Sequence, residues 1–388
     1  MADGNEQSGL QLTPRFPVID GGIWKRISSV KSIDLHKTKP LLIFCSQGQP
    51  QIWNYETGER VADFSSDAGC RHACQPEGAF FFEDDKFVMF DGCTIRVCRR
   101  KVLNTTGDRY CLEYISEVKA HSLGIKVVAV DSVNRLVVSY NDFLLSDAKL
   151  WLWKHSKNAF QFGRAIDMDH TIRGVAFTAS YFAILYRRFV QIWSTSTLTL
   201  HQDLTDDGEH NSAVEFCRDP NKPLLAVGTY TDFPHSKRFF LKVWDYSTRT
   251  CMATKLQGHD DEITSIVWSE YIFSASEDGY IVVWNGSNFQ ALRRCLSGLK
   301  GRLMLALGPG GKVCPDALIV GGDGGIVVLD VRHQTKASGK EQLEERIHEL
   351  EKQLEERTKN DKKQAERIQE LEKQLEVYRR GTGGEVQD

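Results

Sequence analysis

Seven short runs of β-branched and aromatic residues recur along the chain, such as "PQIWN", "LKVWD" and "IVVWN". One residue at or directly before the end of each run is called its anchor. The seven anchors are Trp53, Val97, Trp153, Trp193, Trp244, Trp284 and Leu329. They lie 40 to 56 residues apart, and a repeat of roughly 40 to 45 residues is typical of one four-stranded propeller blade. The spacing therefore predicts an all-β fold, a seven-bladed β-propeller.

The sixth repeat, "HDDEITSIVWSEYIFSASEDGYIVVWN" (residues 259–285), contains the residue types of a Ser/His/Asp hydrolase. A catalytic triad occurs once per active site, whereas this set recurs. Aspartates stand six positions before four anchors, at Asp91, Asp147, Asp278 and Asp323, and histidines begin several repeats, at His121, His170, His210 and His259. The set resembles the structural tetrad of WD40 blades. That resemblance implies a buried hydrogen-bond chain of Trp284, Ser276, His259 and Asp278.

Three repeats have another residue at the aspartate position, namely Gln47, Arg187 and Arg238. We expect core packing to hold these blades together. The last blade lacks an apolar run for its fourth strand, and "GIWKRIS" (residues 22–28) is predicted to supply it and close the ring. Residues 1–20 are then a disordered tail, and the propeller spans residues 21–335.

The composition changes to Glu, Lys, Gln, Leu and Arg after the propeller, and residues 340–380 are predicted to form a coiled coil. Its apolar core positions are Leu343, Ile347, Leu350, Leu354, Ile368, Leu371 and Leu375. The alternative is a single solvated helix held by Glu–Lys pairs. Uninterrupted apolar positions at both ends favour a homo-oligomer, with a parallel dimer expected. Residues 381–388 are expected to be a flexible tail.

The overall charge and the available motifs exclude several functions. The formal net charge is −3, which indicates no nucleic-acid partner. No run approaches the roughly 20 apolar residues of a membrane span, so no direct membrane insertion and a cytoplasmic location are expected. Phosphate loops and HExxH, GxSxG and paired CxxC motifs are absent from the sequence. We therefore expect no enzyme activity, no cofactor and no metal site.

The first repeat contains "VKSIDLH", then Pro40 and "IWNYET", and these residues resemble the first blade of the beta-prime subunit of the coatomer. "VKAHSLGIKVVAV" and "GHDDEITSIVW" extend the similarity. The resemblance implies a propeller face that binds C-terminal dilysine tails of membrane cargo. Carried over by motif, Lys31 and Arg71 match basic carboxylate contacts and Asp142 matches an acidic contact. Ser29, Gln47 and Leu123 depart from the pattern.

These observations predict a non-enzymatic adaptor that binds peptide tails or protein partners in vesicle trafficking and self-associates through its coiled coil. The partners expected are C-terminal tails of membrane cargo or other coat subunits, which would place the protein at the periphery of Golgi or vesicle membranes. The alternative is a general WD40 scaffold in signalling or ubiquitin-ligase assemblies.

Overall fold

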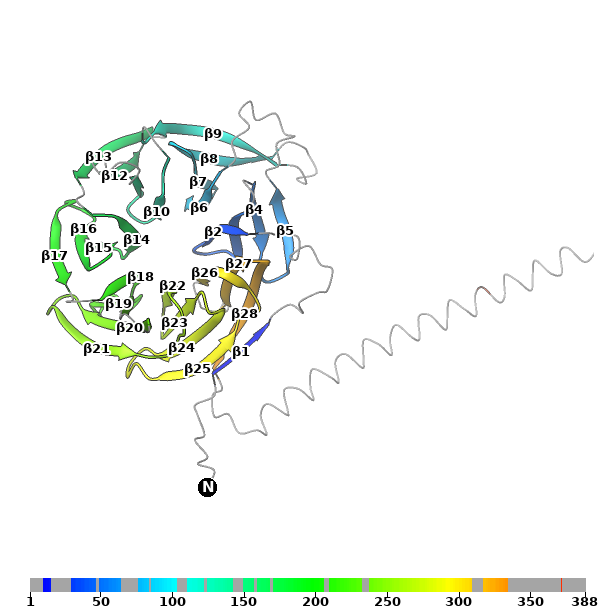
Figure 1. The fold of residues 1–388 in the computed structure, drawn as a ribbon. Coiled ribbons are helices and arrows are strands. Elements are labelled where there is room, and N and C mark those ends of the chain that lie inside the picture. The colour runs from blue at the N-terminus through cyan, green and yellow to red at the C-terminus, as the bar shows by residue number, and fades with distance from the viewer. Residues whose placement is uncertain are drawn as a thin grey trace, which may run out of the picture. The chain divides into compact units, whose positions relative to one another are not determined.

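The structure is a computed structural model of the whole chain. It describes residues 10–14, 29–46, 49–63, 76–83, 85–102, 110–121, 124–141, 149–156, 159–167, 170–205, 209–231, 237–308, 317–333 and 371. The described strands form seven four-stranded antiparallel sheets arranged as blades around a central axis (Figure 1). The all-β, seven-bladed propeller predicted from the repeat spacing is confirmed.

Each of the first six blades is built from four consecutive strands, which run from the channel outward. Blade 1 has β2 (Val30–Leu35), β3 (Leu41–Ser46), β4 (Gln49–Asn54) and β5 (Glu59–Asp63). Blade 2 has β6 (Gly78–Glu83), β7 (Lys86–Asp91), β8 (Thr94–Val102) and β9 (Tyr110–Lys119). Blade 3 has β10 (Val127–Asp131), β11 (Leu136–Asn141), β12 (Lys149–Ser156) and β13 (Ala159–Asp167).

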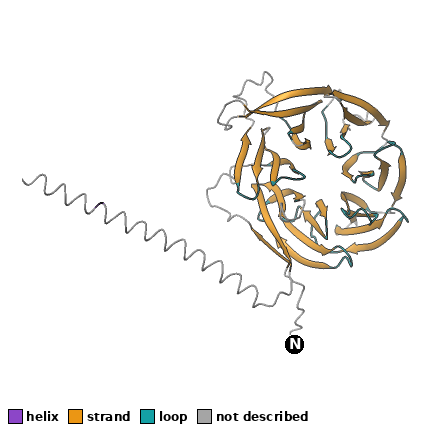
Figure 2. Cartoon of the chain, turned by 180° about the vertical axis from the view of Figure 1, so that it is seen from behind, coloured by secondary structure: helices purple, strands orange, loops and turns teal. Residues whose placement is uncertain are grey.

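The next three blades repeat this order. Blade 4 has β14 (Ile172–Phe177), β15 (Tyr181–Tyr186), β16 (Phe189–Ser194) and β17 (Leu200–Thr205). Blade 5 has β18 (His210–Phe216), β19 (Leu224–Thr231), β20 (Arg238–Asp245) and β21 (Thr250–Leu256). Blade 6 has β22 (Ile263–Trp268), β23 (Tyr271–Ser276), β24 (Tyr280–Asn285) and β25 (Ala291–Leu296). Figure 2 shows the same ring of strands from behind.

Blade 7 combines both ends of the propeller. Its first three strands are β26 (Lys300–Leu307), β27 (Ala317–Asp323) and β28 (Gly325–His333), and its outer strand is β1 (Leu10–Pro14). The prediction that residues 22–28 fill this place was wrong, and within residues 1–20, which we expected to be a disordered tail, Leu10–Pro14 form a strand. Residues 15–28 lie outside the described residues. Leu12 explains the choice of strand, because its side chain is buried against Leu329 and Val331.

The apolar core lies between the blades. Seven clusters of buried residues are found in the described part of the chain, and each joins two adjacent blades. The cluster that joins the first blade to the last contains Leu42 and Trp53 on one side and Ile319 and Val328 on the other. The second strand of a blade is consequently buried on both faces, as in β3, where Leu42–Ser46 are all buried. Outer strands such as β21 alternate between exposed and partly exposed residues.

The chain divides into two units, residues 1–332 and 333–388. Within the second unit the structure describes His333 and Leu371, and Leu371 is helical and about half exposed. The other predicted coiled-coil positions lie outside the described residues, so the coiled coil stays a prediction.

Removing β1 should destabilise the propeller, because it would expose the backbone edge of β28 and uncover the cluster around Leu329. A chain that begins at Arg15 should melt several degrees below one that begins at Leu10, as measured by differential scanning calorimetry. The Leu12→Ala change in the full chain should cost about 2 kcal/mol or more of unfolding free energy. Equal melting temperatures for the two shortened chains would contradict the assignment of β1.

Candidate functional site

Four side chains of blade 6 form one buried hydrogen-bond chain. The Nε1–H of Trp284 donates to Ser274 Oγ at 2.8 Å, and Ser274 Oγ lies 2.8 Å from His259 Nε2. On its other side, His259 Nδ1 lies 3.2 Å from Asp278 Oδ2. The chain is complete when Ser274 donates to His259 Nε2 and the Nδ1–H of His259 donates to Asp278. It connects the loop before β22 to β23, β24 and the turn between them.

The serine of this chain is Ser274, so the assignment of Ser276 to the tetrad was wrong. Ser276 lies two residues further along β23, and its Oγ accepts the backbone N–H of Asp278 at 3.2 Å. Blade 3 shows the same arrangement: Trp153 Nε1–H donates to Ser139 Oγ at 3.0 Å, and His121 Nε2 lies 2.9 Å from that oxygen. The strand register explains which serine contacts the tryptophan. In each blade the tryptophan pairs with a residue of the second strand, and the serine, Ser274 or Ser139, stands two residues after that residue.

The set in blade 6 is inaccessible to a substrate. Ser274 has no exposed surface and Trp284 is 1% exposed, while the side chains of His259 and Asp278 are almost fully buried. Burial alone would raise the pKa of Asp278, but hydrogen bonds from His259 and from the backbone of Asp260 and Tyr280 lower it to about 2. The aspartate therefore stays charged while it holds the loop and the turn together, which is a structural use of these residue types.

Blades without this set combine the expected core packing with other polar contacts. In blades 1 and 4 the tryptophan Nε1–H donates to a glutamine two residues earlier, Gln51 at 3.0 Å and Gln191 at 3.2 Å. Blade 5 contains a buried ion pair, in which Lys242 Nζ lies 2.6 Å from Glu209 Oε2, and Thr229 donates to the same oxygen. Arg187 of blade 4 donates to His210 of blade 5 at 3.1 Å.

The Ser274→Ala change should destabilise the protein more than Ser276→Ala does. Loss of Ser274 Oγ leaves both Trp284 Nε1–H and His259 Nε2 unpaired in the interior, at a cost of about 1 to 3 kcal/mol. Loss of Ser276 Oγ removes one contact to a backbone N–H. Urea denaturation of the two variants at pH 7 measures the difference, and a larger loss for Ser276→Ala would reverse the assignment.

The free energy of unfolding should decrease as the pH is lowered through the range where His121 titrates. Burial lowers the pKa of His121 to about 4, although its hydrogen bond with Ser139 opposes the shift. The unfolded histidine has a pKa of about 6.5, so the unfolded state binds the proton first as the pH falls. The stability due to neutral His121 is thus complete above about pH 6.5 and is lost down to about pH 4. Urea denaturation from pH 7 to pH 4.5 should show a smaller fall for His121→Asn than for the parent chain; an equal fall would contradict this pKa.

The candidate binding surface is the top face, defined as the end of the channel at which the inner strands begin. In four blades the inner strand carries one extra residue near its start that has no partner in the neighbouring strand: Lys31, Arg173, Ser212 and Thr264. In blade 3 Lys126 occupies this place. Its backbone N–H donates to the carbonyl oxygen of Tyr140, and the next residue, Val127, is paired with Tyr140 as well. Such bulges redirect side chains near binding sites. Three of the five residues are cations, in blades 1, 3 and 4.

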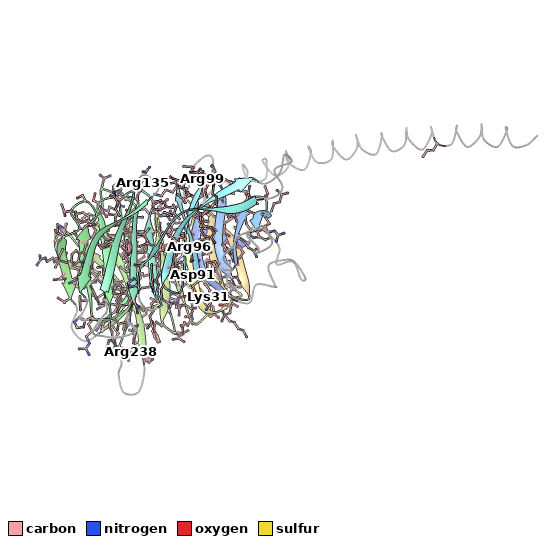
Figure 3. All side chains as sticks on the ribbon, turned by 90° about the horizontal axis from the view of Figure 1, so that it is seen from above. Lys31, Asp91, Arg96, Arg99, Arg135 and Arg238 are labelled. Atoms are coloured by element: carbon pink, nitrogen blue, oxygen red, sulfur yellow. The ribbon has the colours of Figure 1, made fainter. Side chains whose placement is uncertain are left out.

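Lys31 is exposed, and within the described residues it makes no ion pair or hydrogen bond. Figure 3 shows it on the same side of the propeller as Arg238, opposite Arg99 and Arg135. Lys126 is also exposed. The resemblance predicted Lys31 together with Arg71 and Asp142, but Arg71 and Asp142 lie outside the described residues. Sequence reasoning missed Lys126 and Arg173, because their shared position becomes visible only with the strand register.

Arg173 connects three blades across the top face. Its guanidinium lies 3.4 Å from Glu262 Oε1 before β22 and donates to Tyr230 Oη of β19 at 3.3 Å. Tyr230 also lies beneath Lys237, whose Nζ is 5.8 Å from the ring centroid. A basic, an acidic and an aromatic group therefore meet beside the channel. Such a set suits a ligand that carries charges of both signs.

Two buried hydroxyls on this side, Ser212 Oγ and Thr231 Oγ1, have no hydrogen-bond partner among the described residues, and both residues are at most 9% exposed. Ser212 occupies the bulge of β18, and Thr231 ends β19. Because unsatisfied buried polar groups are costly, a polar ligand or water is expected to reach them.

A family model described as "WD domain, G-beta repeat" matches residues 249–285, which include β24 with Trp284 and the turn with Asp278. Together with the seven blades, this match supports a WD40 propeller. Such propellers are typical protein-interaction scaffolds. No curated protein gives a significant match to the chain.

None of the helices in the described residues combines the length and apolar character needed to cross a membrane. In the same part of the chain, no three His, Cys, Asp or Glu side chains are grouped as metal ligands.

Proposed function

We propose that this protein is a non-enzymatic WD40 adaptor whose top face binds the terminal carboxylate, or an acidic end, of a partner peptide. The observation that carries the proposal is the shared bulge position of Lys31, Lys126 and Arg173 around the channel. Lysine and arginine bind carboxylates through charge-assisted hydrogen bonds, which are roughly twice as strong as neutral ones. Glu262 and Tyr230 next to Arg173 supply contacts for a basic group in the same peptide.

The resemblance to the coatomer subunit supports a finer proposal about the partner. C-terminal dilysine tails of membrane cargo combine a terminal carboxylate with two cations, and the top face contains groups of both signs. Arg71 and Asp142 remain predicted contacts to such a tail. On this proposal the protein acts in vesicle trafficking, at the periphery of Golgi or vesicle membranes. Self-association through residues 340–380 would pair two propellers, and a linked second site can raise avidity by about 10² to 10⁴.

The top-face proposal is tested with labelled eight-residue peptides that end in Lys-Lys-X-X and carry either a free carboxylate or an amide. Fluorescence anisotropy should give about tenfold tighter binding of the free acid, which corresponds to one charge-assisted contact. The double change Lys31→Glu, Lys126→Glu should abolish that preference. Lys119→Glu is the matched control, because Lys119 is exposed at the end of the outer strand β9.

Each result of this experiment separates the proposals. Equal binding of acid and amide, or an unchanged preference in the double variant, would refute carboxylate recognition at the top face. Replacing both peptide lysines by serine should weaken binding if the coat-related proposal is right. If the serine peptide binds equally well, the general WD40 scaffold is preferred. A chain that ends at Ser338 should bind to immobilised peptide with a faster apparent off-rate, and light scattering of both chains should show that the longer one alone is a dimer.

A further inference from the structure

The opposite end of the channel contains a cavity of about 830 Å³. We call this end the bottom face, because the inner strands finish there. The cavity walls come from β2, β6, β10, β14 and β18 and from the turns that follow four of these strands, in blades 1 to 5. Pockets of roughly 300 to 1,000 Å³ bury most of a small ligand. The cavity is therefore large enough for one or two side chains of a partner segment.

One layer of the inner strands explains the space. In every blade the residue before the anchor pairs with a residue of the second strand. That second-strand residue in turn pairs with one residue of the inner strand, and these inner-strand residues form the layer. The seven residues of this layer are Asp34, Ala79, Ala129, Ala176, Glu215, Val267 and Ala306. Four of them are alanines, and two of these, Ala129 and Ala176, line the cavity, where their small side chains leave room. Asp34 and Glu215 are the two polar members of the layer, and both line the cavity.

Asp34 already has partners in the protein. Its carboxylate accepts the backbone N–H of Phe81 at 2.8 Å and that of Leu35 at 2.9 Å, which ties blade 1 to blade 2. Lys37 also lies within electrostatic range of it. Burial nevertheless raises the pKa of Asp34 to about 7, against the effect of these hydrogen bonds. Asp34 therefore has a structural role and keeps some capacity to accept a further donor.

Glu215 has no such partners. Within the described part of the chain it makes no hydrogen bond or ion pair, and burial raises its pKa to about 7 despite the nearby charge of Arg218. Arg218 is engaged elsewhere, because its guanidinium donates to the carbonyl oxygens of Leu307 and Gly308 in blade 7 at 3.0 and 3.2 Å. Glu215 is partly exposed to the cavity, and a carboxyl group with limited access to water and no hydrogen-bond donor is unfavourable. It is the group of this cavity that a ligand would satisfy.

The other charged groups of the cavity wall leave Glu215 free. Asp131 accepts the backbone N–H of Val133 and of Asn134 and so holds its own turn. Lys222 lies 3.7 Å from Asp219, and both are exposed to solvent by more than a third. Within the described residues Glu215 therefore has neither a hydrogen-bond nor an ion-pair partner, and Arg218 acts on it through its charge alone.

We propose that the bottom-face cavity binds a basic side chain, lysine or arginine, of a partner protein segment, with Glu215 as its principal acceptor and Asp34 as the second. This site is separate from the top face, so the protein would contact partners at both ends of its channel. The proposal does not depend on carboxylate recognition at the top face.

The test uses the full chain and a library of seven-residue peptides with randomised flanks. The fixed central residue is lysine, arginine or norleucine, which has the four-carbon chain of lysine without its ammonium group. Peptides with lysine or arginine should be captured about tenfold or more above the norleucine set, as expected for a hydrogen bond between charged groups. Glu215→Gln should remove this preference, because it keeps the size of the side chain and removes its charge.

Controls separate this site from the top face and from loss of folding. Glu277→Gln is the matched control, since Glu277 is exposed in the turn after β23 at the top face, and it should keep the preference. The Lys31→Glu, Lys126→Glu variant should keep it as well. Calorimetry should show that Glu215→Gln melts no lower than the parent chain at pH 8, because an ionisable group has been removed from the interior. Equal capture of the lysine and norleucine sets, or a preference that survives in Glu215→Gln, would overturn the proposal.

Discussion

Each blade buries both of its faces against its neighbours, and the fold exists because this burial is continuous around the ring. Each interface is an apolar cluster that takes side chains from two blades, as Ile43 and Ile52 meet Phe81 and Phe87 between blades 1 and 2. A single sheet would leave these side chains in water, at a free-energy cost of roughly 25 cal/mol for each Å² of apolar surface. Closure between blades 7 and 1 is therefore as necessary as any interface within the chain.

Polar interactions hold particular side chains in place within this apolar core. Blades 3 and 6 hold the tryptophan with a serine and a histidine, blades 1 and 4 with a glutamine, and blade 5 contains the Lys242–Glu209 pair. The blades therefore share a geometry and differ in chemistry. Because the inner strands are held in nearly the same register, residues at one position form a layer around the channel. The cations of the top face and the carboxyl groups of the cavity arise in this way.

The fold could be predicted from the sequence because the anchors are apolar and recur at similar intervals, and six of the seven, all except Trp244, are buried. The closing strand could not, since "LQLTP" has few strand-forming residues while "GIWKRIS" has several, and the packing of Leu12 decides between them. The serine assignment failed for a similar reason. Ser274 and Ser276 lie on the same side of one strand, and only the pairing of Ile272 with Trp284 shows which of them meets the indole. Arg173 and Glu215 likewise depend on register, which a single sequence does not reveal.

The outer strand of blade 7 has a consequence for synthesis of the protein. Roughly 310 residues separate β1 from its partner β28, and a ribosome adds about 5 to 20 residues per second. β1 therefore waits roughly 15 to 60 s for its partner. Until then Leu12 lacks Leu329 and Val331, two members of its apolar cluster, and the growing stack of blades has two open faces. A nascent chain of this kind is a natural client for chaperones, and its last interface forms only when translation of the propeller is complete.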